Sequence, residues 1–372
     1  MAKFALTILG IRGIPAAHGG FETFAHHLAL WLRDRDWDVT VYCQGSETGR
    51  REESVWEGIR LIHIPVKREG AVGTIEFDIK STVDALKQPG LILTLGYNTG
   101  FLALLPRLKG LTNYINMDGL EWKRAKYSTA EKTYLWINER LAAWCGNRLL
   151  ADHPAIADHL ATRVSRNKLD MIPYGSNAID HADPAPLAPL GLEPGKFLTL
   201  IARPEPENSV LEIVQAFSRK PRGVKLAVLG KYSSSVPYQA KVLESGSDEV
   251  IFPGAIYDPE SIQALRFHSL AYMHGHQVGG TNPSLVEALG AGNPVIAHDN
   301  LFNRWVAGAS GVYFANEDEC ADRIDALLTD ETARTALGIA ARARWAEAFT
   351  WPMVLESYRE MLERGAAKAA RR

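Results

Sequence analysis

The stretch "FALTILGIRGIPAAHGGFETF", residues 4–24, joins a short apolar run to a glycine-rich loop and then to a helical pattern. The apolar run has no strict alternation, which is typical of a strand buried on both faces of a parallel sheet. Behind the loop, apolar side chains recur on one helical face: Phe21, Phe24, Ala25, Leu28, Trp31 and Leu32. The stretch therefore predicts a strand, a loop and a helix in the order that begins an α/β domain.

The same order of strand and helix returns almost from end to end, which predicts the α/β class with mostly parallel sheets. It starts again at "KFLTLIAR", residues 196–203, so each half is expected to form its own sheet. Residues 176–196 are rich in Pro, Ala and Asp and have no sustained period, which is typical of a linker. A chain of 372 residues also exceeds the size at which single cores usually stop growing. We therefore predict domains at residues 1–178 and 179–349.

Composition excludes several classes of protein. The net charge of −2 argues against a nucleic-acid binder, which usually has a strongly basic domain. The cysteines, Cys43, Cys145 and Cys320, have no metal-ligand spacing and favour a reducing cytoplasm. No stretch approaches the roughly 18 consecutive apolar residues of a membrane span, and the first residues are predicted to form a strand and not a signal peptide. The expectation is a cytoplasmic globular protein.

Two glycine-containing loops precede helices at the ends of predicted strands, where ligands bind in parallel α/β sheets. Gly19 and Gly20 precede the first helix, whose N-terminus offers unpaired N–H groups to an anion such as phosphate. Their spacing matches neither the dinucleotide fingerprint nor a P-loop, so a simple tight turn is the alternative. In the second half, residues 279–282 precede a helix that Pro283 can start, with Glu287 one turn inside.

Other polar residues also stand at strand ends. Arg203 can make bidentate contacts with a diphosphate. His274 is interpreted either as a pocket contact or as a structural side chain. Asp34, Asp36 and Asp38 lie at the opposite sheet edge, where a solvated turn is favoured over a metal site, and no metal site is predicted. Loops of this kind on two sheets indicate a nucleotide ligand held between two domains.

Residues 101–150 are basic, with eight Lys or Arg against four acids, a net of +4. Trp122, Trp136 and Trp144 are interleaved with these charges. One interpretation is an ordinary helix with a solvated face. The other is contact with an anionic membrane surface or a lipid pyrophosphate.

Five motifs follow one another along nearly the whole chain: "GGFE", "NMDGLEWKR", "MIPYGSN", "ARPEPEN" and "GGTNPSLVEALGAGNPVIA". In this order they resemble the retaining nucleotide-sugar glycosyltransferases of family 4, and within it the rhamnosyltransferase-like enzymes of bacterial polysaccharide synthesis. The resemblance implies the GT-B fold, in which two Rossmann-like domains face each other across a cleft. It also implies that a C-terminal helix, residues 350–366, crosses back onto the first domain. The first domain would bind the acceptor and the second the donor.

The resemblance further implies roles for single residues. Glu287 matches the glutamate that binds the nucleotide ribose, Arg203 the arginine that holds the diphosphate, and Gly20 the first-domain backbone beside it. Asp118 stands where many members carry a histidine close to the donor sugar. The expected donor-binding residues are Gly19, Gly20, Arg203, Asn208, His274, Gly280, Thr281, Asn282, Ser284 and Glu287. The expected acceptor-binding residues are Glu22, Asp118, Trp122, Lys123 and Arg124, and the expected catalytic residues are Asp118, Arg203 and Asn208.

Three departures from the family pattern concern charge. Asp118, in place of the histidine, changes both the charge and the donor capacity at its position. Gly279 replaces the first of two glutamates, a role that the backbone N–H groups of residues 280–282 can fill. Asn208 replaces a lysine, which leaves Arg203 as the clearer positive charge on the departing diphosphate. These changes are expected to reflect a deoxysugar donor.

The expected reaction is transfer of a hexose, L-rhamnose from dTDP-rhamnose, to a hydroxyl of a lipid-linked glycan precursor. Neither a metal nor another cofactor is expected, and the protein is expected in the cytoplasm or at the inner face of the membrane. Two alternatives stay open. One is a UDP-sugar donor, UDP-glucose or UDP-N-acetylhexosamine, on the same scaffold. The other is a non-catalytic protein that binds sugar nucleotides.

Overall fold

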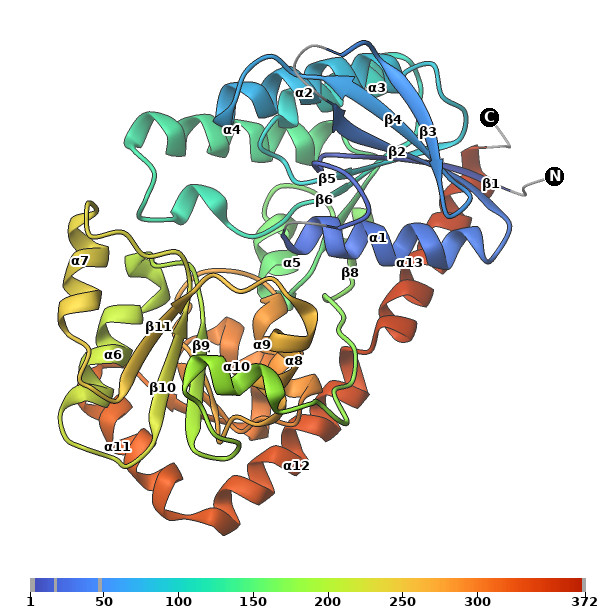
Figure 1. The fold of residues 1–372 in the computed structure, drawn as a ribbon. Coiled ribbons are helices and arrows are strands. Elements are labelled where there is room, and N and C mark those ends of the chain that lie inside the picture. The colour runs from blue at the N-terminus through green and yellow to red at the C-terminus, as the bar shows by residue number, and fades with distance from the viewer. Residues whose placement is uncertain (1–3, 17–18, 46–48, 370–372) are drawn as a thin grey trace. The chain divides into compact units, whose positions relative to one another are not determined.

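The computed structural model describes residues 4–16, 19–45 and 49–369 (Figure 1). The chain forms two compact units. The first comprises Met1–Trp122, Tyr127–Tyr174 and Trp351–Arg372, and the second comprises Lys123–Lys126 and Gly175–Thr350. Each unit has one sheet, which confirms the predicted α/β class with a separate sheet for each half. The division falls after Tyr174 and after Thr350, whereas the sequence placed it after residues 178 and 349.

The sheet of the first unit has the strand order β3-β4-β2-β1-β5-β6-β7-β8. Its strands are β1 (Phe4–Leu9), β2 (Trp37–Gly45), β3 (Glu52–Trp56), β4 (Ile59–Pro65), β5 (Leu91–Leu95), β6 (Asn113–Asn116), β7 (Arg148–Ala151) and β8 (Leu169–Met171). All neighbours are parallel except β3 and β4, which form an antiparallel hairpin. Its two turn residues, Glu57 and Gly58, have positive φ angles of 50° and 77°, as a two-residue hairpin turn requires.

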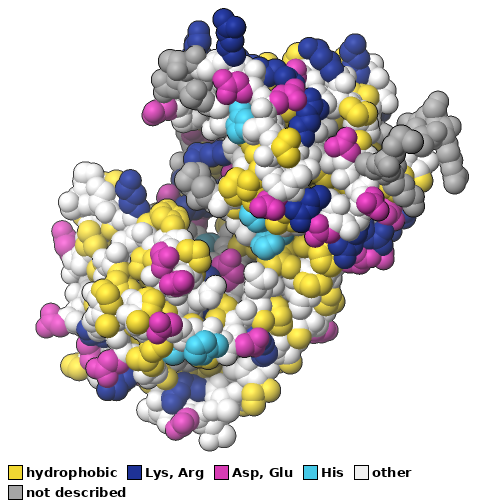
Figure 2. Space-filling model, turned by 45° about the vertical axis from the view of Figure 1, so that its right-hand side comes forward, with side chains coloured by type: hydrophobic (Ala, Val, Ile, Leu, Met, Phe, Trp, Pro, Cys, Tyr) yellow, Lys and Arg dark blue, Asp and Glu magenta, His cyan; other side chains and the backbone are white. Residues whose placement is uncertain are grey.

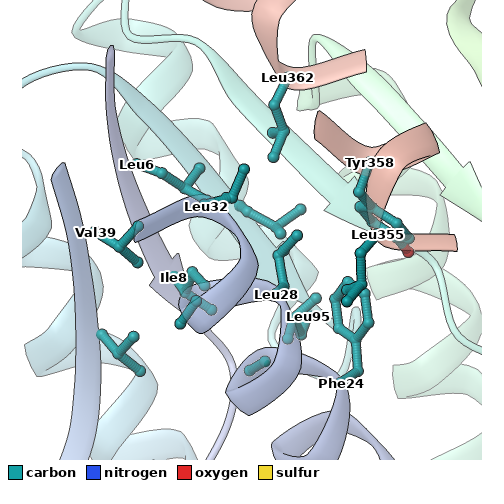
Figure 3. Packing of buried hydrophobic residues seen from close by; sticks show 14 of the residues in the cluster. Leu6, Ile8, Phe24, Leu28, Leu32, Val39, Leu95, Leu355, Tyr358 and Leu362 are labelled. Atoms are coloured by element: carbon teal, nitrogen blue, oxygen red, sulfur yellow. The ribbon is translucent and has the colours of Figure 1, made fainter. Parts of the chain in front are cut away.

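One part of the core of the first unit lies between its sheet and two helices from opposite ends of the chain. The helices of this unit are α1 (Gly20–Arg33), α2 (Gly70–Ala85), α3 (Leu104–Leu108), α4 (Thr129–Cys145), α5 (Pro154–Ala161) and α13 (Trp351–Ala369). Figure 3 shows side chains of α1 and α13 meeting over β1. The rings of Phe24 and Tyr358 lie 4.5 Å apart, and the Tyr358 hydroxyl accepts a hydrogen bond from Asn116 at 3.1 Å. The last helix is therefore part of the core that the first helix begins.

The second unit has a fully parallel sheet of order β11-β10-β9-β12-β13-β14. Its strands are β9 (Phe197–Ile201), β10 (Lys225–Leu229), β11 (Val250–Gly254), β12 (Tyr272–His274), β13 (Val295–His298) and β14 (Gly311–Phe314). Its helices are α6 (Val210–Ser218), α7 (Pro237–Glu244), α8 (Pro259–Phe267), α9 (Pro283–Gly290), α10 (Leu301–Ala307), α11 (Glu317–Thr329) and α12 (Glu331–Ala348).

The segment predicted as a linker, residues 176–196, is mostly irregular but not loose. Its Ala182, Leu187 and Leu192 are buried in one cluster with Phe197 at the start of β9. Burial of these apolar side chains makes the segment a part of the second unit, which a prediction from composition alone could not show.

Each sheet has one point at which the strand order reverses, between β1 and β5 in the first unit and between β9 and β12 in the second. The loops that leave two such strands diverge to opposite faces of the sheet and open a crevice at their carboxyl ends. The fold therefore marks one candidate ligand-binding edge in each unit.

Candidate functional site

In the second unit, the loops that follow β9 and β12 are packed against each other at the reversal point. Gly275 has no side chain, and a Cβ atom there would lie 2.1 Å from the carbonyl oxygen of Asn208. The N–H of Gln277 donates to the carbonyl of Glu207 at 2.9 Å. The glycine is thus required for the close approach of the two loops.

Arg203 and Asn208 lie on the same tight loop after β9. The buried Asn208 amide donates to the Arg203 carbonyl at 2.8 Å, which closes the loop. The Arg203 side chain is exposed, and within the described parts of the chain its guanidinium has no hydrogen-bond or ion-pair partner. The structure therefore brings the two predicted residues together, with Asn208 holding the loop and Arg203 available to an anion.

Residues 123–126 group with this second unit, although the chain on both sides belongs to the first. Arg124 Nη1 lies 3.6 Å from Glu207 Oε1, and the N–H of Ala125 donates to Glu207 Oε2 at 3.1 Å. Lys123 and Arg124, which the sequence assigned to the acceptor, therefore lie on a segment that is anchored to the Arg203 loop.

His274 lies beneath this edge with no exposed surface. Its ring stacks on that of His276 at 4.4 Å, and neither of its nitrogens has a hydrogen-bond partner among the described residues. Burial lowers the pKa of His274 well below its usual value, and burial together with Arg203 and Arg124 lowers the pKa of His276 to about 3. Both imidazoles are neutral. We expect His276, and not the His274 that the sequence singled out, to face a ligand.

The predicted glycine loop, residues 279–282, leads into α9 in the second unit. The Asn282 side chain caps the helix by accepting the N–H of Ser284 at 3.0 Å, and Thr281 is buried. The Ser284 hydroxyl lies 2.6 Å from that of Tyr272 on β12, so it also ties the helix to the sheet. Gly280 is half-buried at the start of this turn.

Glu287 lies one turn further along α9 and is partly exposed. Its carboxylate forms an ion pair with Arg266 of α8, which is buried. Arg266 therefore fixes the orientation of Glu287, while the Glu287 side chain stays partly accessible.

In the first unit, the loop after β1 turns into α1 through Gly19, whose φ angle is 62°. Glu22 Oε1 accepts the N–H of Arg12 at 3.2 Å, and a Cβ atom on Gly19 would lie 2.7 Å from Glu22 Oε2. Glu22 thus braces the loop from the first turn of the helix, where a carboxylate is favoured. Gly20 is the first residue of α1, and Ala17 and His18 of the quoted loop lie outside the described residues.

Trp122, a predicted acceptor residue, belongs to the first unit. Its indole N–H donates to Glu139 of α4 at 2.6 Å, and Glu139 also lies 3.0 Å from His159 of α5. The Trp122 ring is therefore held by a buried polar cluster.

The reversal point of the first unit opens into a pocket. Gly10 follows β1, Gly96 follows β5 and Asp118 follows β6, and all three line the pocket with Asp78 and Thr99. The free volume of about 150 Å³ is several times what one water molecule needs, so the pocket can hold a larger polar group. The structure thus places the predicted Asp118 at a concave site.

Asp78 was not predicted. It lies on α2, where Thr74, Asp78, Ser81 and Thr82 recur at helical spacing and all line the pocket. Such a polar stripe on the inward face of a helix is the signal that could have identified it. Burial raises the pKa of the Asp78 carboxyl to about 6, although Thr99 donates a hydrogen bond to it at 2.8 Å.

We expect this raised pKa to make the first unit less stable as the pH rises from about 4 to 6. In that window the folded chain keeps a proton on Asp78 that the unfolded chain has lost. Asp78→Asn removes this dependence, so from pH 4 to pH 7 its stability should rise relative to wild type, by on the order of 3 kcal/mol at most. Urea unfolding followed by tryptophan fluorescence measures this, because seven of the nine tryptophans lie in the first unit.

The control for this prediction is Asp158→Asn, which removes an exposed carboxyl of the same unit. It should keep the pH dependence of the wild type. An Asp78→Asn variant whose stability parallels that of wild type at every pH would contradict the assignment.

Among the described residues, no group of three or more His, Cys, Asp or Glu side chains is placed to hold a metal ion. None of the helices that the structure describes combines the length and the apolar character that a membrane crossing needs. Acidic and basic side chains are mixed over the face shown in Figure 2, in keeping with the near-neutral net charge.

Helix α4 has an apolar face that is open to solvent. Trp136, Ile137 and Trp144 are 41%, 45% and 56% exposed, and the guanidinium of Arg140 lies over the Trp136 ring, 3.2 Å from its centroid. The opposite face, with Leu135, is buried. An exposed face with two tryptophans and an isoleucine is unusual for a helix that only covers a core.

Comparison with known families divides the chain in the same way as the fold does. Residues 189–344 match the family described as glycosyl transferases group 1. Residues 3–177 match a domain of unknown function, DUF1972. No curated protein matches the chain in sequence.

Solved structures resemble the whole chain. A sucrose-phosphate synthase from Thermosynechococcus elongatus has a TM-score of 0.83 at 18% identity, covering 98% of this chain and 100% of its own. Alr3699/HepE from Anabaena, in complex with UDP and glucose, has a TM-score of 0.77 at 16% identity, with coverages of 97% and 99%. WaaG, a glycosyltransferase involved in lipopolysaccharide biosynthesis, has a TM-score of 0.74 at 16% identity, with coverages of 96% and 99%. The fold is GT-B, as the motifs implied, and the family match supports a glycosyltransferase.

Proposed function

We propose that this protein is a retaining glycosyltransferase that moves L-rhamnose from dTDP-rhamnose to a hydroxyl of a lipid-linked glycan precursor. The observation that carries the proposal is the edge of the second unit at which the strand order reverses. The loop after β9 carries the exposed Arg203, and the segment after β12 leads to the capped N-terminus of α9 and the oriented carboxylate of Glu287. A cation and helix N–H groups suit a diphosphate, and a carboxylate suits sugar hydroxyls. The choice of rhamnose rests on the "DGLEWKR" and "GGTNPSLVEA" motifs.

In this reaction the chain supplies positive charge and N–H donors that stabilise the departing diphosphate. The bond from C1 of the sugar to the diphosphate oxygen breaks as the acceptor oxygen bonds to C1 on the same face, and the acceptor proton passes to a diphosphate oxygen. Preorganised donors aimed at the developing negative charge usually make the largest contribution to catalysis. Arg203 and the N–H groups at the start of α9 have this role, and no metal ion is needed for it.

The acceptor is proposed to bind at the first-unit pocket. Hydroxyl, amide and carboxyl groups line it, including Asp78, Thr99 and Asp118, which suits a ligand with several hydroxyl groups such as a sugar. The Asp78 carboxyl, with its pKa near 6, can exchange a proton close to neutral pH.

Donor profiling tests the proposal. The protein is incubated with dTDP-rhamnose, UDP-glucose or UDP-N-acetylhexosamine and a lipid-pyrophosphate-linked sugar, and nucleoside diphosphate release is measured with and without EDTA. The proposal predicts release of dTDP alone, insensitive to EDTA, and a product whose anomeric configuration by NMR is that of the donor. Release of UDP instead supports the alternative, a UDP-sugar donor. The similar structure of Alr3699/HepE, which is in complex with UDP and glucose, is the reason for including this donor. Binding without any release supports the non-catalytic sugar-nucleotide protein.

The proposal places the protein at the inner face of the membrane, where a lipid-linked acceptor is presented. The exposed face of α4 is the surface that would contact anionic lipid, since tryptophans prefer the interface and Arg140, stacked on Trp136, adds a positive charge. Contact would be peripheral.

We expect replacement of Trp136 and Trp144 together by serine to lower binding to anionic vesicles about tenfold or more, because burial of two large apolar side chains is lost. Liposome flotation measures this binding. Ile339→Ser, at an equally prominent exposed site on α12, is the matched control and should bind as wild type does. Equal flotation of all three proteins would remove α4 from the proposal.

A further inference from the structure

We propose that Arg124, carried by the segment 123–126, joins Arg203 in holding the diphosphate of the nucleotide donor. The inference rests on the proposed function and moves Arg124 from the acceptor to the donor. This four-residue segment groups with the second unit.

The segment is anchored at one glutamate. Glu207 binds it twice, through an ion pair of 3.6 Å with the Arg124 guanidinium and a hydrogen bond of 3.1 Å from the Ala125 N–H. The side chains of Arg124 and Glu207 are 16% and 8% exposed, so the pair is largely shielded from water. Partly buried pairs of this kind hold their geometry better than exposed ones.

Glu207 is also part of the Arg203 loop. The bond from Asn208 to the Arg203 carbonyl, 2.8 Å, and the bond from the Glu205 N–H to the same carbonyl, also 2.8 Å, fold residues 203–208 into one tight turn. The geometry therefore links Arg124 to Arg203 through a short and rigid path. Both guanidiniums act on the same neighbour, since each lowers the pKa of His276.

The net charge of the Arg203 loop explains why a second cation would be needed to bind a diphosphate. The loop "RPEPEN" holds one arginine and two glutamates, a net of −1, which by itself disfavours an anion. The amide of Asn208 adds no charge and is engaged with the backbone. Arg124, anchored to this loop through Glu207, supplies a second cation and brings the net charge of the four groups to zero. Two forked cations match the two phosphoryl groups of a diphosphate.

The test compares nucleoside diphosphate with monophosphate. Calorimetry with dTDP and dTMP is run on wild type, Arg124→Ala, Arg124→Lys and Lys126→Ala, the last removing one positive charge from the same segment. Arg124→Ala should weaken dTDP binding about tenfold or more and change dTMP binding less than about twofold. The reason is that Arg124 is proposed to bind the second phosphoryl group, which dTDP has and dTMP lacks. Lys126→Ala should bind both as wild type does.

Each outcome decides the inference. Arg124→Lys keeps the positive charge but not the forked N–H donors of the guanidinium, and we expect its dTDP affinity to lie between those of wild type and Arg124→Ala. If the alanine variant does not fold, the lysine variant replaces it in the comparison of dTDP with dTMP. Unchanged dTDP binding in Arg124→Ala, or equal loss of dTDP and dTMP, overturns the role of Arg124 while the proposed function stands. Failure of the wild type to bind dTDP at all overturns the proposed function itself.

Discussion

Arg203→Ala is expected to lower the rate of sugar transfer by about 100- to 1000-fold. The guanidinium stands exposed at the carboxyl end of β9, on a loop held by Asn208, and it has no ion-pair partner in the described residues. A positioned cation of this kind stabilises the charge that develops on the departing diphosphate, so its removal should act on kcat more than on KM. The measurement is steady-state release of dTDP from dTDP-rhamnose.

The matched control is Arg219→Ala. Arg219 is also an arginine of the second unit, but it forms an exposed pair with Glu317 on the surface. This variant should keep wild-type rates, because exposed ion pairs contribute little to stability. Since the exposed Arg203 side chain makes no hydrogen bond or ion pair within the described residues, the fold should be intact in both variants. A rate for Arg203→Ala within threefold of wild type would remove Arg203 from the leaving-group site.

Much of the fold could be predicted because its central strands are buried on both faces. Runs such as "FALTIL" and "FLTLI" are apolar except for one threonine each, and the helices between them keep their apolar face at a helical period. The edge strand β3, Glu52–Trp56, was not predicted. Almost all of its side chains are exposed, and its hairpin with β4 stabilises it through backbone pairing, so no apolar pattern marks it.

The candidate site could be predicted only in part. Residues that follow a strand directly, such as Arg203 and Asp118, can be located from the sequence because the carboxyl ends of parallel strands share one edge. The pair of Arg124 and Glu207 joins positions 83 residues apart, on a segment whose own neighbours belong to the other unit. No local spacing can predict such a contact, because it depends on the packing of the complete fold.

Glu287→Gln is expected to weaken dTDP binding by about 10- to 100-fold. The proposed partner of the carboxylate is a ribose hydroxyl, and a hydrogen bond to a charged group contributes about 1.5–3 kcal/mol. Glutamine is preferred to alanine here because Arg266 is buried and paired with Glu287. The amide oxygen of the glutamine still offers Arg266 a hydrogen-bond acceptor. An alanine would leave a buried charge unpaired, which destabilises a protein by about 3–5 kcal/mol.

A dideoxy analogue separates the ribose contact from any loss of structure. The deoxyribose of dTDP offers one hydroxyl, at the 3′ position, and 2′,3′-dideoxythymidine diphosphate offers none. Wild type should bind the analogue about as weakly as Glu287→Gln binds dTDP, and the variant should bind both nucleotides alike, because the lost partner is the same. Glu317→Ala, which breaks the surface pair with Arg219, is the control and should retain the full preference for dTDP. If Glu287→Gln still prefers dTDP to the analogue as strongly as wild type does, the hydroxyl is recognised elsewhere and the assignment of Glu287 to the ribose is wrong.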